Sequence, residues 1–276
     1  GSVSDWKWLA ECGTHVHVRR VRCDASNDAA VRAIVQAAHG DVPHFGSVFH
    51  AAHQLADATL VNQFARNFRS TYGPKVRGTA TLHATLCHAP LRCFNVFSSI
   101  VGMLGFAGQA PHAAANTWLD AMAGCRRGCG ICGQSVNWGV VSEVGYAARH
   151  GADRRAEASG YGSVSRAVAL AAIESTMLTM ACSFAVLPAD WSKLFSGSVQ
   201  VRGLLTPYAG RQVGSSSGSA FSSSVSMGMS ASFPVCDEEA LLLREASTLP
   251  RSTGGYVRLA LAAHIACLEL CDTTYS

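Results

Sequence analysis

Short apolar runs alternate with longer amphipathic segments along most of the chain. Runs at residues 15–22, 45–50, 93–98, 134–138 and 182–187 are rich in β-branched and aromatic side chains and end at polar or turn residues, which predicts strands. Apolar residues at helical spacing predict helices at 29–39 and 164–179, and a longer one at 59–89 that breaks near Gly73 and Pro74. Strands that alternate with helices in this way predict an α/β fold with a parallel sheet and helices on both faces.

The composition changes after residue 195. Residues 196–236 are rich in serine and glycine, with serine-dominated runs at 215–219 and 222–224, which is typical of a flexible linker. Helical spacing returns in residues 237–276, where Leu261, Ile265 and Leu268 fall on one face. The sequence therefore predicts an α/β domain at 1–195, a linker at 196–236 and a short helical tail at 237–276.

Composition and charge narrow the class of protein. The chain of 276 residues is 49% hydrophobic and 14% charged, which suits a globular α/β protein. Its net charge of +4 is scattered, with residues 19–22 as the densest basic group, so no nucleic-acid interface is expected. The N-terminus shows no secretory signal, and the apolar window 175–189 is too short to span a membrane. We therefore expect a cytoplasmic protein with no membrane contact.

The cysteines do not indicate a disulfide framework or a metal site. There are eleven of them, an odd number, in a chain without a secretory signal. Cys129 and Cys132 form one C-x-x-C pair, and Cys125 lies one helical turn before it. A single pair without a second is weak evidence for zinc, and we expect no metal.

The candidate chemistry lies in residues 94–139. Residues 94–99 read FNVFSS, a turn with three glycines follows, residues 108–120 read GQAPHAAANTWLD, and residues 135–139 read SVNWG. This order is strand, loop, helix, strand, with an Ala-rich helix that can lie close to a parallel sheet. Open α/β sheets place their chemistry at the carboxyl ends of the strands, where these polar side chains fall.

This stretch resembles the ketoreductase domains of modular polyketide synthases and, more distantly, of animal-type fatty acid synthases, within the short-chain dehydrogenase/reductase superfamily. That family reads F-x-x-F-S-S, then G-x-x-G-Q-x-x-Y-A-A-A-N-x-x-L-D, then S-x-N-W-G. The resemblance implies a Rossmann-like sheet, NADPH as cofactor, and reduction of a carrier-bound β-ketoacyl thioester to the β-hydroxyacyl product. Neighbouring synthase domains would be its partners. The tail at 237–276 faintly resembles the start of an acyl carrier domain, without the G-x-D-S-L that holds the phosphopantetheine arm.

Carried over residue by residue, the catalytic set of the family becomes Lys75, Ser99, His112 and Asn116. Lys75 lies in P-K-V-x-G, Ser99 comes thirteen residues before His112, and Asn116 lies one helical turn after it. The family has tyrosine where this chain has His112. An imidazole ends roughly 2 Å short of a phenol oxygen, beyond hydrogen-bond reach. Its pKa is also near ~6.5 rather than ~10. We therefore expect impaired catalysis.

The same resemblance indicates cofactor-binding residues. Asp24 would lie beside the adenine, although residues 24–28 also suit a helix N-cap cluster. His50, Ala51 and Ala52 match the start of the family's H-A-A-G, but His53 replaces the glycine that would let the backbone approach the cofactor. Asn137 lies in the S-x-N-W-G strand. Residues 55–57 match the family's L-D-D loop except for a central alanine, so the stereochemistry of reduction is not assigned.

One feature of a dinucleotide site has no counterpart. No G-x-G-x-x-G turn precedes the first predicted strand, and the glycines at 102–108 belong to the loop after the serine strand. This predicts an incomplete, N-terminally truncated ketoreductase, in which the strand at 15–22 pairs directly with that at 45–50 or leaves edges exposed. Two alternatives stay open: a non-catalytic pseudo-reductase that serves as a scaffold or docking element, and a stand-alone short-chain reductase.

Overall fold

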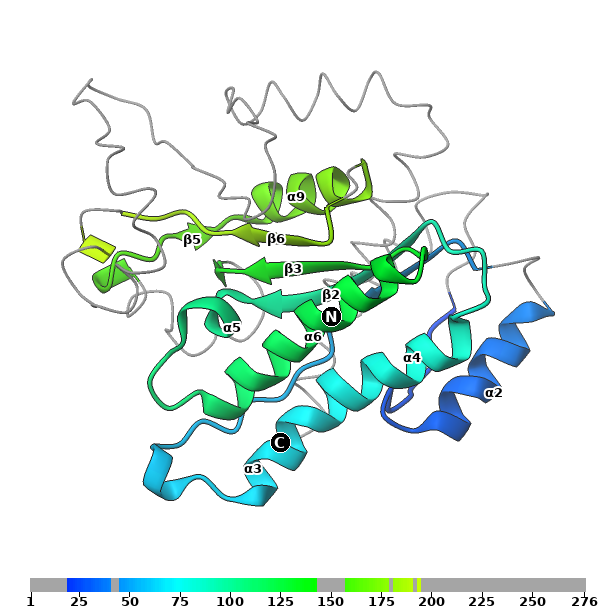
Figure 1. The fold of residues 1–276 in the computed structure, drawn as a ribbon, viewed down its shortest axis with the longest axis horizontal. Helices are drawn as coiled ribbons and strands as arrows, with labels where there is room; N and C mark the ends of the chain where they lie inside the picture. The colour runs from blue at the N-terminus through cyan, green and yellow to red at the C-terminus, as the bar shows by residue number, and fades with distance from the viewer. Residues whose placement is uncertain (1–18, 41–44, 143–156, 179–180, 191–192, 195–276) are drawn as a thin grey trace.

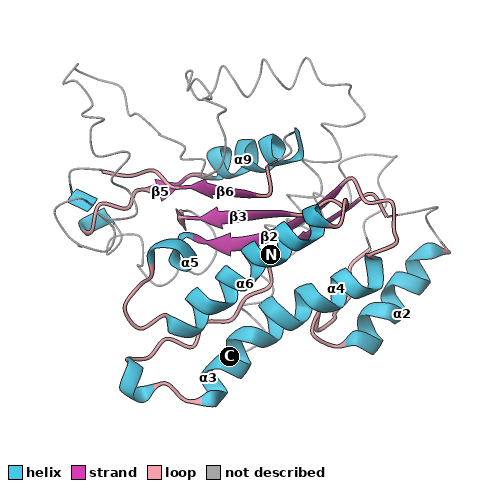
Figure 2. Cartoon of the chain, viewed as in Figure 1, coloured by secondary structure: helices cyan, strands magenta, loops and turns pink. Residues whose placement is uncertain are grey.

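The computed structural model describes residues 19–40, 45–142, 157–178, 181–190 and 193–194. Its centre is a parallel sheet in the order β1 (Ser47–His50), β2 (Cys93–Ser99), β3 (Gln134–Trp138) and β6 (Ser183–Val186). The other described elements are α2 (Asp28–His39), η1 (Leu60–Asn62), α3 (Ala65–Tyr72), η2 (Gly73–Arg77), α4 (Gly78–Leu86), α5 (Ile100–Leu104), α6 (Ala110–Gly128), β4 (Val140–Val141), β5 (Ser163–Val164) and α9 (Arg166–Leu178). Figure 2 shows the helices packed along this sheet.

Helices cover both faces of the sheet, as predicted. On one face, Phe94 and Val96 of β2 pack with Leu119 of α6. On the other face, Val136 and Trp138 of β3 pack with residues of α9, and the fully buried Asn95 amide donates to Thr176 Oγ1 of α9 at 3.0 Å. Every residue of β3 is buried, which is the burial expected of a central strand between two helical layers.

Helix α6 determines how close the helical layer lies to the sheet. Its buried side chains include Ala115, Leu119 and Ala123, spaced four residues apart on one face. The C-terminal part is attached by Arg126, which is 2% exposed, donates to Cys132 O at 2.7 Å and stacks over the Phe94 ring at 3.8 Å. This buried attachment holds α6 against β2 and the start of β3 (Figure 1).

The helix predicted at 59–89 is interrupted where Gly73 and Pro74 were expected to break it. Helix α3 ends at Tyr72, five residues form the π-helical turn η2, and α4 continues to Leu86. Residues 60–62 form a separate 3-10 turn, so the helix begins later than predicted. The break is confirmed, and its form is a π turn that contains Lys75.

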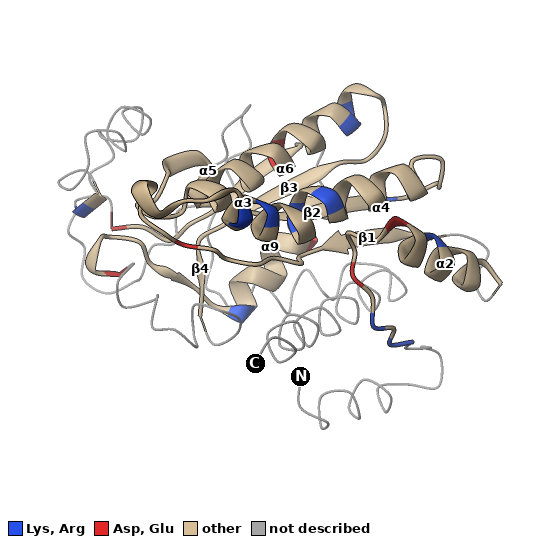
Figure 3. Ribbon diagram, turned by 90° about the horizontal axis from the view of Figure 1, so that it is seen from below, with Lys and Arg blue, Asp and Glu red and all other residues tan. Residues whose placement is uncertain are grey.

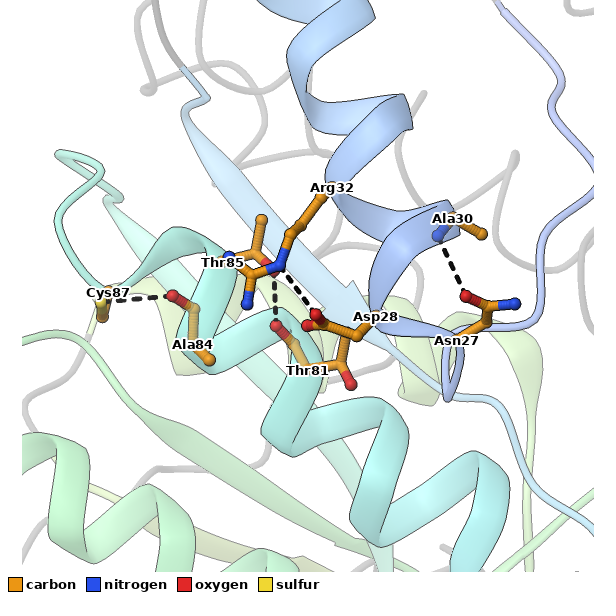
Figure 4. A network of polar contacts seen from close by, with 8 residues as sticks. All are labelled: Asn27, Asp28, Ala30, Arg32, Thr81, Ala84, Thr85 and Cys87. Carbon is orange, nitrogen blue, oxygen red and sulfur yellow. Dashed lines mark hydrogen bonds and ion pairs between the residues drawn. The ribbon is translucent and has the colours of Figure 1, made fainter.

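Helix α2 begins where the polar cluster predicted it. The Asn27 side chain accepts from the Ala30 amide at 3.1 Å as the N-cap, and Arg32 donates to Asp28 one turn later at 2.8 Å (Figure 4). The same view shows α2 beside α4, whose Thr85 hydroxyl donates to Thr81 O. The Asp28–Arg32 pair is exposed and adds little stability.

The strand predicted at 15–22 is wrong over the part that the structure describes. Residues 19–22 are exposed and have no regular secondary structure, with Val21 at 45% exposure. Alternating valines form a strand only where a neighbouring strand accepts their backbone groups, and β1 pairs with β2 alone among the described strands. The short β4–β5 pair was not predicted. Residues 15–18, the linker at 196–236 and the tail at 237–276 lie outside the described residues.

Outside residues 19–22, the charged residues of the described part are spread over several elements. Lys and Arg positions are distributed over several helices of the described part (Figure 3). No helix within the described ranges is long and apolar enough to cross a membrane.

Candidate active site

Lys75 lies at the centre of the candidate site. The π turn η2 carries it inward, where the side chain is 3% exposed. Its Nζ donates to Phe97 O of β2 and to Asn116 Oδ1 of α6, both at 2.8 Å. Burial lowers the pKa of Lys75 to about 7, although the Asp120 carboxylate acts in the opposite direction. The amine therefore loses its proton at a lower pH than an exposed lysine does.

Three polar residues of α6 form a stripe toward this amine. His112, Asn116 and Asp120 are spaced four residues apart and so lie on one face of the helix. The fully buried Asn116 accepts from Lys75 and donates from Nδ2 to His112 O at 2.9 Å. The structure thus brings together Lys75, Asn116 and His112, three members of the predicted catalytic set.

The His112 imidazole is neutral. Burial, followed by the nearby Lys75 and His53, lowers the pKa of His112 to about 3. Its Nδ1 is buried and has no hydrogen-bond partner in the described structure. The position therefore holds an uncharged ring, and the proximity of Lys75 favours that state.

Ser99 ends β2 and begins α5. Its hydroxyl donates to Trp138 O of β3 at 3.3 Å and accepts from the Val101 amide at 3.3 Å, which makes it the N-cap of α5. These contacts are local to the carboxyl ends of β2 and β3. The predicted role of Ser99 in holding a substrate oxygen stays a prediction.

Behind the stripe lies a buried polar network, of which sequence reasoning had named Asn116 and Asn137 as site residues but not Asp120, Ser98, Ser135 or Ser183. Asp120 accepts from Ser135 Oγ at 2.5 Å and from Asn137 Nδ2 at 3.1 Å, and Ser98 Oγ contacts Asn137 Oδ1 at 3.1 Å and Asn116 O at 3.2 Å. Asn137 also donates to Ser183 Oγ of β6 at 3.1 Å. Burial raises the pKa of Asp120, and the hydrogen bonds from Ser135, Ser98 and Asn137 act against that rise. The sequence feature that could have indicated this network is the position of Asp120 four residues after Asn116, which places both residues on one face of the helix.

The predicted cofactor residues differ in how far they are exposed to solvent. His50 is 5% exposed and bonds through Nε2 to Pro74 O at 2.9 Å, and Asn137 is fully buried within the polar network. Asp24 is exposed and accepts from the amide and hydroxyl of Ser26, both at 2.8 Å, as in a helix-entry turn. Ala51 is buried at 6% exposure and Ala52 is half-buried after β1.

The described residues do not fit a dinucleotide. His50 and Asn137 have their polar atoms committed inside the protein. In the described part of the chain, the Gly-rich turn with positive φ at Gly105 and Gly108 lies between α5 and α6, after the serine strand. Gln109 of that turn donates to Asp57 of the 55–57 loop at 2.8 Å, so the turn is fastened to a protein carboxylate. No cradle of backbone N–H groups for a pyrophosphate is formed by these residues.

Metal chemistry gains no support from the described ranges. They contain no group of three or more His, Cys, Asp or Glu side chains arranged to hold a metal ion. Cys129 and Cys132 are free thiols in the turn between α6 and β3.

A sequence model of the KR domain matches residues 4–143, just over half of the chain. The chain belongs to the KR, or ketoreductase, domain family. The chain is 36% identical over 173 residues to the hybrid PKS-NRPS synthetase pyvA of Aspergillus violaceofuscus, covering 62% of this chain and 4% of that protein. It is 34% identical over 174 residues to the polyketide synthase GfsB of Streptomyces halstedii, covering 62% of this chain and 3% of that one.

Solved ketoreductases share this fold. A-type ketoreductases from a modular polyketide synthase superpose with a TM-score of 0.62 at 29% identity, over 65% of this chain and 38% of theirs. The first ketoreductase of the tylosin polyketide synthase gives a TM-score of 0.58 at 31% identity, over 66% and 38%. The predicted Rossmann-like α/β class is confirmed. This KR chain spans under a tenth of the synthases and about two fifths of the solved ketoreductase chains.

Proposed function

We propose that this chain is the ketoreductase region of a polyketide synthase in which the fold is kept and the reduction step is lost. The family reaction uses NADPH to reduce a carrier-bound β-ketoacyl thioester to the β-hydroxyacyl product. The observation that carries the proposal is the neutral, half-buried His112 in the position where the family has tyrosine.

The chemistry of ketone reduction explains why this exchange matters. Hydride reaches the carbonyl carbon only if the developing oxygen anion receives a proton. A neutral imidazole is a much weaker acid than a phenol whose pKa is lowered by a neighbouring cation. Loss of a general acid costs on the order of 10²–10⁴ in rate. Lys75 and Asn116 keep their mutual contact, so the proposed loss of the reduction step rests on the proton donor at position 112.

Within a synthase, such a chain would act as a scaffold beside neighbouring domains. The buried polar network from Asp120 to Asn116 and the two-sided packing of the sheet support an intact fold without the reduction. Its partners would be the adjoining synthase domains and the carrier-bound acyl thioester presented there. The small share of each synthase that this chain covers favours this reading over a stand-alone reductase.

The test distinguishes the loss of the proton donor at position 112 from the loss of NADPH binding. NADPH is titrated by fluorescence into the wild-type chain, His112→Tyr and the control His112→Phe, and NADPH consumption is followed with a small β-ketoacyl thioester. We expect no saturable binding below about millimolar cofactor in any of the three, because the described residues offer no pyrophosphate cradle. Tight binding with turnover only in His112→Tyr would leave the proton donor as the sole deficit. Turnover by the wild-type chain would overturn the proposal.

A further inference from the structure

The turn that carries Lys75 changes the acceptors of one backbone amide. In an α-helix the Gly78 amide would donate to Pro74 O, four residues before it. In η2 this amide donates instead to the carbonyls of Gly73 and Lys75. A π turn of this kind often occurs at functional sites, and here it holds the buried Lys75. The Gly78 amide therefore does not pair with Pro74 O, and this carbonyl can accept from a donor in another part of the fold.

His50 supplies that donor. It is the last residue of β1, it is 5% exposed, and its Nε2 lies 2.9 Å from Pro74 O. Because a carbonyl oxygen can only accept, the proton of the ring must be on Nε2. Burial lowers the pKa of His50 to about 4, so the ring is the neutral donor at physiological pH.

Because Gly78 has no side chain, it leaves room for the His50 imidazole. A Cβ at this position would lie 3.1 Å from both Cε1 and Nε2 of His50. Contacts this tight require the ring or the helix to shift by a few tenths of an ångström, and such a shift would disturb the bond between His50 Nε2 and Pro74 O. Gly73, at the other end of the same turn, has open space where a Cβ would be.

We propose that His50 is a positioning residue: by bonding Pro74 O it holds η2 in its π geometry and so places the Lys75 amine against Phe97 O and Asn116 Oδ1. His50 acts through the turn and does not itself touch a substrate or cofactor. The assignment concerns the geometry of Lys75 and is independent of whether the site reduces a ketone.

The test follows Lys75 directly, without activity. The chain contains three lysines, so uniform ¹³C-lysine labelling gives three Cε signals, and Lys75→Met identifies the one that belongs to Lys75. We expect this signal to titrate at about 7 in the wild type. His50→Gln keeps a side-chain donor and should retain that midpoint. His50→Phe keeps the ring shape without the donor and should move the midpoint upward, toward the 10.5 of an ordinary lysine.

A matched glycine pair provides the second readout. Gly78→Ala should shift the Lys75 midpoint upward as His50→Phe does, whereas Gly73→Ala should leave it unchanged. If His50→Phe does not fold, the Lys75 midpoints of Gly78→Ala, Gly73→Ala and His50→Gln test the proposal instead. An unchanged Lys75 titration in folded His50→Phe or Gly78→Ala would overturn the proposal. NADPH turnover is a separate measurement, so failure of the proposed function and failure of this assignment are distinguishable.

Discussion

At the scale of single residues, the site is built from ionisable groups that the fold holds in their neutral forms. His50 and His112 are both buried enough that their pKa values fall to about 4 and about 3. The neighbouring Lys75 contributes to both shifts, so the three residues form one electrostatic group. A phenol in place of His112 would meet the same cation and would be made more acidic by it, which is the opposite consequence for proton donation.

These shifts predict acid sensitivity of the fold. The unfolded histidines bind protons near ~6.5, whereas the folded ones resist protonation down to about 4 and about 3. Between these values the unfolded chain binds more protons, so the free energy of unfolding should fall as the pH drops below about 6.5. For His50 alone the loss approaches about 3 kcal/mol at its folded pKa.

Urea unfolding at several pH values between about 7 and 4.5 measures this loss. His112→Phe should make the stability less dependent on pH, because one of the two groups is removed. His88→Gln, at an exposed position, serves as the control and should follow the wild type. A pH dependence that is identical in His112→Phe and wild type would contradict the assigned state of His112.

At the scale of elements, α6 packs closely against Gly133, the residue just before β3. A Cβ on Gly133 would lie 2.7 Å from both Ala123 O and Arg126 Cβ, whereas Gly124 within α6 has nothing within 4 Å. We predict that Gly133→Ala lowers the free energy of unfolding by about 1–3 kcal/mol through overpacking. Gly124→Ala should raise it by up to about 1 kcal/mol, because alanine favours the helix. Urea denaturation of both variants measures the difference, and equal effects would refute the close contact.

The network below α6 allows a second prediction at this scale. Asp120 accepts from Ser135 and Asn137, so Asp120→Ala leaves two buried donors unpaired. We expect a loss of about 1–3 kcal/mol, as for other buried donors left without an acceptor. Asp120→Asn keeps one acceptor oxygen and should lose less. Thermal unfolding of the two variants ranks them, and a larger loss in Asp120→Asn would argue against the network.

The elements that the sequence predicted are those whose signals are local. The apolar strand at 93–98, the Ala-rich helix and the break at Gly73 and Pro74 are each contained in a few adjacent residues. The contacts made by tertiary packing were not predictable in this way: Ser98, Asp120 and Ser135 lie in three separate segments of the matched motif, and their spacing does not indicate the hydrogen bonds that they make. The predicted strand at 15–22 is wrong over residues 19–22. Its local pattern of residues suits a strand, but no described strand pairs with it.

At the scale of the whole molecule, β1 is one outer strand of the sheet within the described residues. Among the described strands, β1 pairs with β2 alone, in parallel register from Ser47 with Cys93 to His50 with Val96. An unpaired strand edge can template association with another chain, and natural proteins often block such edges with lysine. Ser47 is exposed at the start of this edge and carries no charge. The site and the edge are linked, because His50 of the same strand holds the Lys75 turn.

The last prediction follows from this edge. The wild-type chain should associate with itself as its concentration rises, and Ser47→Lys should reduce that association by placing a charge at the strand edge. Gln36→Lys changes the net charge by the same amount at an exposed position of α2 and should have no comparable effect. Size-exclusion chromatography with light scattering, run over a concentration series, compares the three proteins. Equal suppression by both lysines would assign the association to net charge, and a wild-type chain that stays monomeric throughout would show that the β1 edge is not a site of self-association.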